Sequence, residues 1–233
     1  IHQLSEDLLE ILSEKKESEE PSSQLPANVD LGVTAEDEIE TVDRWFVKKK
    51  GVSHANHRVF MIHSMGATAS MFSHFLHNPP LGSEAWAVQL PGREHRFQDP
   101  LFTRLDLLVE SLYQAILPHL DLPISLYGHS FGGIVAFELA RKLRREGHPE
   151  VHHLYISGTM PPQQTLTWKN SNMMQQTAIT TNSEKKLLSL MSFIDDVEFL
   201  KKIRPLMQRD MPLLMSYDYQ EEAPLETPIT IFS

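Results

Sequence analysis

The sequence predicts an α/β fold built on a mostly parallel sheet. Short apolar runs with the length of buried strands alternate along the chain with longer segments whose apolar residues recur at helical spacing. The strand-like runs lie at residues 59–62, 84–91, 124–127, 151–158 and 228–233, and the helical segments at 103–119 and 131–145. Alternation of this kind favours a parallel sheet whose faces are covered by helices.

Composition excludes several classes of protein. A length of 233 residues permits one domain with a substantial core. There is no cysteine, and the formal net charge is -10, which argues against a surface for nucleic acid or anionic membrane. No run approaches the roughly 20 apolar residues of a membrane-spanning helix, and no signal-peptide pattern occurs. We therefore expect a cytoplasmic protein that needs neither a metal nor a cofactor.

The amino-terminal part differs from the rest. Residues 1–16 carry leucine and isoleucine on one face of a predicted helix, and residues 17–44 form a linker rich in Glu, Ser and Pro. The helix is the tail of a preceding domain, a docking segment, or a surface helix of the same domain. We expect the folded domain to cover residues 45–233, beginning at the aromatic pair Trp45-Phe46.

The most informative stretch is Gly128-His129-Ser130-Phe131-Gly132, between the run at 124–127 and the helix that follows. The pattern Gly-x-Ser-x-Gly on a strand-to-helix turn holds its serine in a strained conformation at the end of the sheet. Ser130 is therefore the candidate nucleophile, and the free N–H of Phe131 is a candidate oxyanion donor. The alternative is a chance pentapeptide with a buried structural serine, which the flanking strand and helix disfavour.

A second loop follows the run at 59–62 and reads His63-Ser64-Met65-Gly66-Ala67. A buried strand followed by small residues suits a loop that aims a second N–H at the oxyanion, and Met65 or its neighbour is the candidate donor. An ordinary glycine turn is the alternative. His63 is a candidate for the wall of the substrate channel; a hydrogen bond to its own loop is a simpler role for it than that of a base.

The segment at about 160–216 interrupts the alternation of strand and helix. It is rich in Met, Gln, Thr and Asn, and an insertion at this point would sit over the carboxyl ends of the strands. We interpret it as a helical lid. Met173, Met174 and Met191 are candidates to line an acyl channel, because methionine offers an adaptable apolar surface. Helical core packing is the alternative role for these side chains.

Four stretches together resemble one family. They are 45–47, 62–72, the Leu-Pro-Gly-Arg-Glu-His-Arg-Phe stretch at 90–97, and the elbow with its helix at 128–141. In these stretches the chain resembles the thioesterases of polyketide and nonribosomal peptide assembly lines, in particular the type II-like branch of the α/β-hydrolases. Where that family often has Pro, Ala and Gly in its first loop, this chain has His63, Met65 and Ala67.

The resemblance implies an α/β-hydrolase fold and an activity. Ser130 would take an acyl group from a phosphopantetheine thioester on an acyl or peptidyl carrier protein and release it by hydrolysis or transfer, in the biosynthesis of secondary metabolites. A weaker likeness makes residues 1–16 the tail of a carrier domain. A general serine esterase or lipase, and a non-catalytic module that docks on a carrier protein, are the rival functions.

One feature of the family is not found in the sequence. Hydrolases of this fold order their triad Ser, Asp, His along the chain, and no histidine follows His153. The resemblance places the Asp after the strand at 229–232 and the His further on. We therefore expect both residues beyond Ser233, with the carboxyl-terminal part of the domain missing from this chain.

Overall fold

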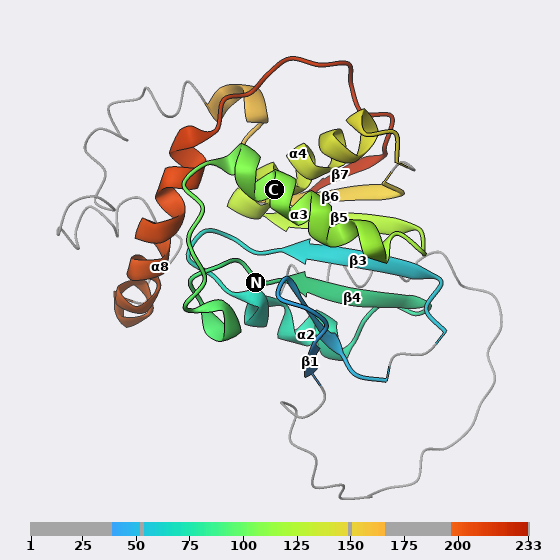
Figure 1. Ribbon diagram of the computed structural model, residues 1–233, viewed down its shortest axis with the longest axis horizontal. Coiled ribbons are helices and arrows are strands. Elements are labelled where there is room, and N and C mark those ends of the chain that lie inside the picture. The colour runs from blue at the N-terminus through green and yellow to red at the C-terminus, as the bar shows by residue number, and fades with distance from the viewer. Residues whose placement is uncertain (1–38, 52–53, 149–150, 166–196, 233) are drawn as a thin grey trace, which may run out of the picture.

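The computed structural model describes residues 39–51, 54–148, 151–165 and 197–232 (Figure 1). Within them a seven-stranded sheet has the order β1-β2-β4-β3-β5-β6-β7. The strands are β1 (Ile39–Thr41), β2 (Phe46–Lys49), β3 (His57–Ile62), β4 (Ser83–Val88), β5 (Ile124–His129), β6 (His153–Ser157) and β7 (Ile229–Phe232). β1 pairs with β2, and β2 with β4, in antiparallel fashion, and all the other pairs are parallel. The predicted α/β class with a mostly parallel sheet is confirmed.

Helices follow the strands as the periodicity predicted. The α-helices are α2 (Ser73–His77), α3 (Leu105–Ile116), α4 (Phe131–Arg145) and α8 (Val197–Ser216), and the 3-10 helices are η2 (Ala69–Phe72), η3 (Glu94–Arg96), η4 (Leu117–His119) and η5 (Pro162–Gln164). α8 forms about the last third of the segment expected as a lid. In Figure 1 the arrowhead of β3 points toward α8, which lies beyond that end of the sheet. Among the residues that the structure describes, none of the helices could span a lipid bilayer.

Two of the sequence-based predictions lie outside the described residues, and a third differs from the structure. The predicted helix at 1–16 and the first part of the lid, with Met173, Met174 and Met191, lie outside the described residues. β1 occupies part of the range that we expected as linker: Ile39 faces Lys49 in the register, so the sheet begins six residues before the aromatic pair Trp45-Phe46. A three-residue edge strand with half-buried side chains carries too little apolar periodicity to stand out in a sequence.

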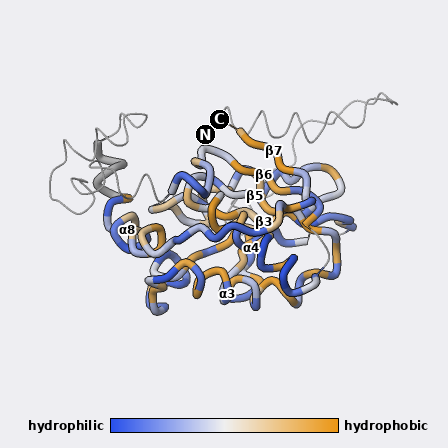
Figure 2. Tube along the Cα trace, turned by 90° about the horizontal axis from the view of Figure 1, so that it is seen from above, coloured by the Kyte–Doolittle hydropathy of each residue, from blue (hydrophilic) through white to orange (hydrophobic). Residues whose placement is uncertain are grey.

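The sheet has a core on each face. α3 and α4 lie on one face, where Leu108, Leu112 and Leu139 pack with strand residues such as Phe60 and Leu126. Figure 2 shows both helices on the same side of the strands. η2 and α2 cover the other face, with a smaller core that includes Phe72, Phe75, Leu76, Met61 and Tyr127. Burial on both faces is why the central strands appear as continuous apolar runs.

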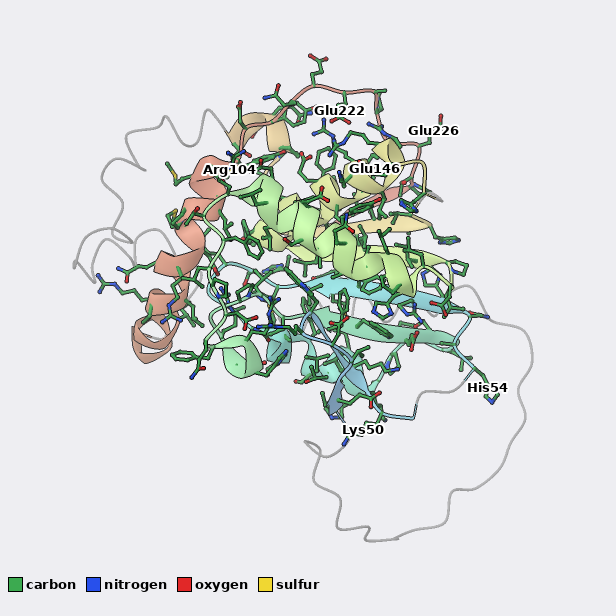
Figure 3. The ribbon with its side chains drawn as sticks, viewed as in Figure 1. Lys50, His54, Arg104, Glu146, Glu222 and Glu226 are labelled. Atoms are coloured by element: carbon green, nitrogen blue, oxygen red, sulfur yellow. The ribbon has the colours of Figure 1, made fainter. Side chains whose placement is uncertain are left out.

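The basic end of α4 holds the segment that returns the chain from α8 to β7. The buried guanidinium of Arg141 contacts Glu138 and Glu222, 2.8 Å away in each case, and donates to the carbonyl of Gln220 at 2.5 Å. Arg144 and Arg145 also pair with Glu222, which Figure 3 labels on the connecting segment. These contacts fix the path of the chain into β7.

The core makes a stability prediction. Leu126 is fully buried at the centre of β5, whereas Leu81 is 94% exposed. Leu126→Ala should lower the free energy of unfolding by about 2–5 kcal/mol, because it removes buried methyl groups and leaves a cavity. The same substitution at Leu81 should change it by less than about 0.5 kcal/mol. Urea unfolding followed by circular dichroism measures both, and equal effects would contradict the assigned core.

Candidate active site

Ser130 occupies the turn between β5 and α4 in a conformation that L-amino acids rarely adopt. Its backbone has φ 53° and ψ −118°. Three hydrogen bonds hold it there. The Ser130 N–H donates to the carbonyl of Ser157 at 2.7 Å, and the Ser130 carbonyl accepts from the N–H of Gly133 at 2.9 Å and from Thr159 Oγ1 at 2.5 Å. A conformation of this kind costs about 1–3 kcal/mol and persists only where its surroundings impose it.

The glycines around Ser130 permit a close approach of three elements. A Cβ at Gly128 would overlap the backbone of Gly132, and a Cβ at Gly132 would overlap the carbonyl oxygen of Ile62 at the end of β3. Strand β5, the first turn of α4 and the end of β3 are therefore packed backbone against backbone. These close contacts explain why one glycine lies two positions before Ser130 and another lies two positions after it.

The loop after β3 lies at the same edge of the sheet. β3 and β5 are parallel neighbours, with Ile62 opposite Gly128. Past Ile62, the N–H of Ala67 donates to the carbonyl of Ser64 at 3.1 Å, and Gly66 has φ 77°. This is the pattern of a type II turn with Met65 and Gly66 at its centre. The parallel register thus brings the predicted second loop beside the elbow.

Two backbone donors of these loops remain unused within the described residues. Neither the N–H of Phe131 nor that of Met65 donates to another group there. Phe131 is the first residue of α4, where a helix leaves its N–H groups without intrahelical partners. Ser130 is half-buried, and its Oγ has no hydrogen-bond partner among the described residues. The site therefore offers a hydroxyl and free amide donors on two adjacent loops.

The structure places neither nearby histidine as a partner of Ser130. His129 Nδ1 lies 3.2 Å from Ser157 Oγ on the neighbouring strand. His63, expected at the channel wall, is completely buried, and its Nδ1–H donates to the carbonyl of Ser64 at 2.8 Å. Its ring belongs to the support of the loop, which is the simpler of the two roles considered for it.

Burial controls the charge of His63. The pKa of His63 is lowered to about 4, mainly because burial removes the ring from water and secondly because the positive charge of Arg93 lies nearby. The imidazole is therefore neutral at pH 7, and its Nε2 is buried without a partner in the described structure. A neutral ring beside a guanidinium suits a site in which both groups are shielded from water.

The lid helix α8 reaches the loop after β3 through residues that sequence reasoning missed. Asp210 is buried, pairs with the buried Arg93 and accepts a hydrogen bond from the N–H of Gly66 at 2.8 Å. Arg93 belongs to the stretch at 90–97 that resembles the family, but nothing in that stretch indicates its ion pair with Asp210. An isolated acidic residue in a methionine-rich segment gave no comparable signal.

Comparison with known proteins decides the family. The family described as "Thioesterase domain" matches residues 57–233. The chain belongs to the thioesterase domain family. It is 31% identical over 194 residues to the "Gramicidin S biosynthesis protein GrsT" of Aneurinibacillus migulanus, a match that covers 83% of this chain and 76% of that protein.

Solved thioesterases share the fold. RedJ, titled a thioesterase "from the Prodiginine biosynthetic pathway in Streptomyces coelicolor", has a TM-score of 0.65 and 26% identity over 77% of this chain and 67% of its own. The type II thioesterase BorB "from the borrelidin biosynthetic cluster" has the same TM-score at 21% identity, covering 82% of this chain and 76% of its own, and shows the fold alone. The predicted family resemblance is thus confirmed, and the chain has the α/β-hydrolase fold of these thioesterases.

The buried imidazole of this thioesterase-family chain predicts a pH dependence. Because the folded-state pKa of His63 lies below the unfolded value of about 6.5, the unfolded chain binds more protons between those two pH values. Stability associated with His63 is therefore complete above about pH 6.5 and is lost as the pH falls to about 4. At 1.36 kcal/mol per pKa unit the loss is about 3 kcal/mol.

The variant His63→Asn tests this assignment, since asparagine keeps an amide donor for the Ser64 carbonyl but does not titrate. Denaturant unfolding at pH 7 and pH 4 should show a smaller loss of stability in the variant than in the parent protein, by about 3 kcal/mol. His148→Asn is a matched control, because the His148 ring is only half-buried and its Nε2 lies 2.8 Å from the Tyr113 hydroxyl, away from the loop after β3. Identical pH profiles for the parent and His63→Asn would contradict the assignment.

Proposed function

We propose that the protein cleaves the thioester of an acyl group carried on phosphopantetheine, through an acyl-enzyme on Ser130. The observation that carries the proposal is the strained Ser130 at the end of β5, beside unused N–H groups on two adjacent loops. Family membership supports the choice of a thioester, and the relatives named above belong to the biosynthesis of gramicidin S and to the prodiginine biosynthetic pathway.

In the first half-reaction Ser130 Oγ attacks the thioester carbonyl carbon and gives up its proton to a base. The carbonyl oxygen becomes negative, and the N–H groups of Phe131 and Met65 stabilise it. The tetrahedral intermediate collapses by breaking the C–S bond, and the phosphopantetheine thiolate leaves with the proton that the base returns. Removal of one such donor in a serine hydrolase costs about 10²–10³ in rate, so these two N–H groups supply a large part of the catalysis.

In the second half-reaction water attacks the Ser130 ester, loses a proton to the base, and releases a carboxylic acid with regeneration of the serine hydroxyl. A hydroxyl or amine of the substrate can take the place of water and gives an ester or amide. The base is none of the described histidines near the site, since His129 is bound to Ser157 and His63 is buried. We propose that the carboxylate and the imidazole of the triad follow β7, where the triad order of this fold places them.

The proposed partner is an acyl or peptidyl carrier protein. The relatives include AmbE of Pseudomonas aeruginosa, named an antimetabolite synthetase, which is 25% identical over 79% of this chain; the match covers only 9% of that protein. A domain that recurs both as a separate protein and inside a much longer synthetase suits a substrate that is delivered on a tethered arm. A serine esterase and a carrier-docking module remain the rivals.

Ser130→Ala tests whether the protein is an enzyme of this kind. Hydrolysis of a pantetheine thioester by the complete protein should fall by at least about 10³-fold, because no other group supplies the nucleophile. Ser125→Ala is the matched control, since Ser125 is a buried serine of β5, the strand that leads to Ser130, and its Oγ lies 2.9 Å from His57 Nε2. Undiminished turnover in Ser130→Ala would refute the assignment. Carrier binding without turnover in the parent protein would favour the docking module.

Substrate choice separates a thioesterase from a general esterase. The complete protein should show a kcat/KM at least about 10-fold higher for an acyl group on a phosphopantetheinylated carrier protein than for the p-nitrophenyl ester of the same acid. The reason is that binding energy from the carrier and its arm can be used in the transition state. A preference for the p-nitrophenyl ester would favour the esterase.

A further inference from the structure

A buried ion pair joins the lid helix to the stretch at 90–97. Arg93 and Asp210 each have only 2% of their side chain exposed, and they come from the loop after β4 and from α8. Arg93 Nη1 donates to Asp210 Oδ2 at 2.9 Å, and Nη2 donates to Oδ1. The pair is therefore bidentate, a geometry that holds both side chains in one orientation.

The same carboxylate also holds the turn that carries Met65. Asp210 Oδ2 accepts from the N–H of Gly66 at 2.8 Å. The central peptide of this turn lies between Met65 and Gly66. In a type II turn the plane of that peptide is rotated by about 180° relative to its orientation in a type I turn. A rotated peptide would turn the Met65 carbonyl toward the carboxylate in place of the Gly66 N–H. Asp210 therefore favours one of the two conformations of the turn.

Arg93 fixes the peptide between Ala67 and Thr68, by which the chain leaves the turn. Its Nη1 donates to the carbonyl of Ala67 at 2.9 Å, and its Nε donates to the carbonyl of Pro91 at 3.2 Å. The ion pair thus binds a donor and an acceptor on two consecutive residues of the loop. An ion pair that served only to attach the lid would not need these contacts with the backbone beside Met65.

The helix is seated on both loops at this point. A Cβ at Gly66 would overlap Met207 of α8, so the helix packs directly on the turn. Arg209 Nη1 donates to the carbonyl of Gly92 at 2.6 Å. The position of α8 and the conformation of the Met65 turn are therefore mechanically linked.

We propose that Asp210 is a positioning residue: with Arg93 it anchors the Ser64–Ala67 turn against α8. It thereby keeps Met65, whose own N–H lies one peptide before the one that Asp210 binds, in place beside Ser130, and transition-state stabilisation depends on the seating of α8. This inference rests on the proposed function. It concerns the rate of the chemical step and not the binding of substrate, because Asp210 and Arg93 are buried between α8 and the turn, with 2% of each side chain exposed.

The test compares Asp210→Leu and Asp210→Asn in the complete protein with a pantetheine thioester as substrate. Asp210→Leu removes the acceptor of the Gly66 N–H and should lower kcat about 10- to 100-fold, less than the loss of a whole oxyanion donor, with KM changed less than about threefold. Asp210→Asn keeps an acceptor and should retain more of kcat than Asp210→Leu. A kcat of Asp210→Leu within twofold of the parent would overturn the proposal, as would equal losses in the two variants.

A second buried pair provides the control. Arg58 and Glu84 are each 7% exposed, are joined at 2.6 Å, and lie at the amino-terminal ends of β3 and β4, away from Ser130. Glu84→Gln should lower the melting temperature as Asp210→Asn does but leave kcat within twofold of the parent. A loss of kcat in Glu84→Gln as large as that in Asp210→Asn would make the effect one of general stability and would overturn the proposal.

A readout independent of catalysis distinguishes this inference from the proposed function. Amide hydrogen exchange at Gly66 should be slow in the parent and in Ser130→Ala, and at least about 10-fold faster in Asp210→Leu. If Ser130→Ala keeps full activity, the proposed function fails while the exchange data still report on the turn. If Ser130→Ala is inactive but Gly66 exchanges at the same rate in Asp210→Leu and the parent, only the positioning role of Asp210 fails. Asp210→Ala, which also lacks an acceptor for the Gly66 N–H, serves for both measurements if Asp210→Leu does not fold.

Discussion

Ser130 must adopt a backbone conformation that an L-residue avoids, and the arrangement around it follows from that constraint. With φ 53° and ψ −118° the turn from β5 into α4 is tight enough to leave the serine at the end of the strand and to start a helix directly after it. The conformation is held by Thr159, Gly133 and Ser157 through the Ser130 backbone. Gly128 and Gly132 have no Cβ, so β5, α4 and β3 can approach one another closely. The strain of about 1–3 kcal/mol is thus offset by contacts from several elements.

The parallel topology places further loops beside the turn that carries Ser130, and together they form the candidate site. Because β3, β4 and β5 run in the same direction, the loops that follow them meet at one edge of the sheet. One loop carries Met65, the next carries Arg93, and the third carries Ser130. Helix α8 lies over the first two and contributes Asp210 to their contact. The shared direction of the strands therefore brings together residues that are far apart in the sequence.

The sequence predicts the elements that are determined by neighbouring residues, but not the contacts between residues that lie far apart in the chain. The central strands, α3, α4 and the elbow at Ser130 were predictable because apolar periodicity and glycine spacing are properties of short windows. β1 was missed because an edge strand of three residues leaves almost no pattern. The contacts of Asp210 were not predictable, since its partner Arg93 lies 117 residues earlier in the chain. The complete burial of His63 was missed for the same reason: it depends on how the loops after β3 and β4 pack under α8.

The central claim is that an acyl group passes through an ester on Ser130. The most direct test is to mix the complete protein with a pantetheine thioester, quench with acid within the first turnover, and analyse a protease digest by mass spectrometry. The account predicts that the peptide containing Ser130 gains the mass of the acyl group minus one hydrogen, and that fragmentation places it on the serine oxygen. An enzyme that turns over its thioester with no acyl adduct on Ser130, or with the adduct on another residue, would contradict the account.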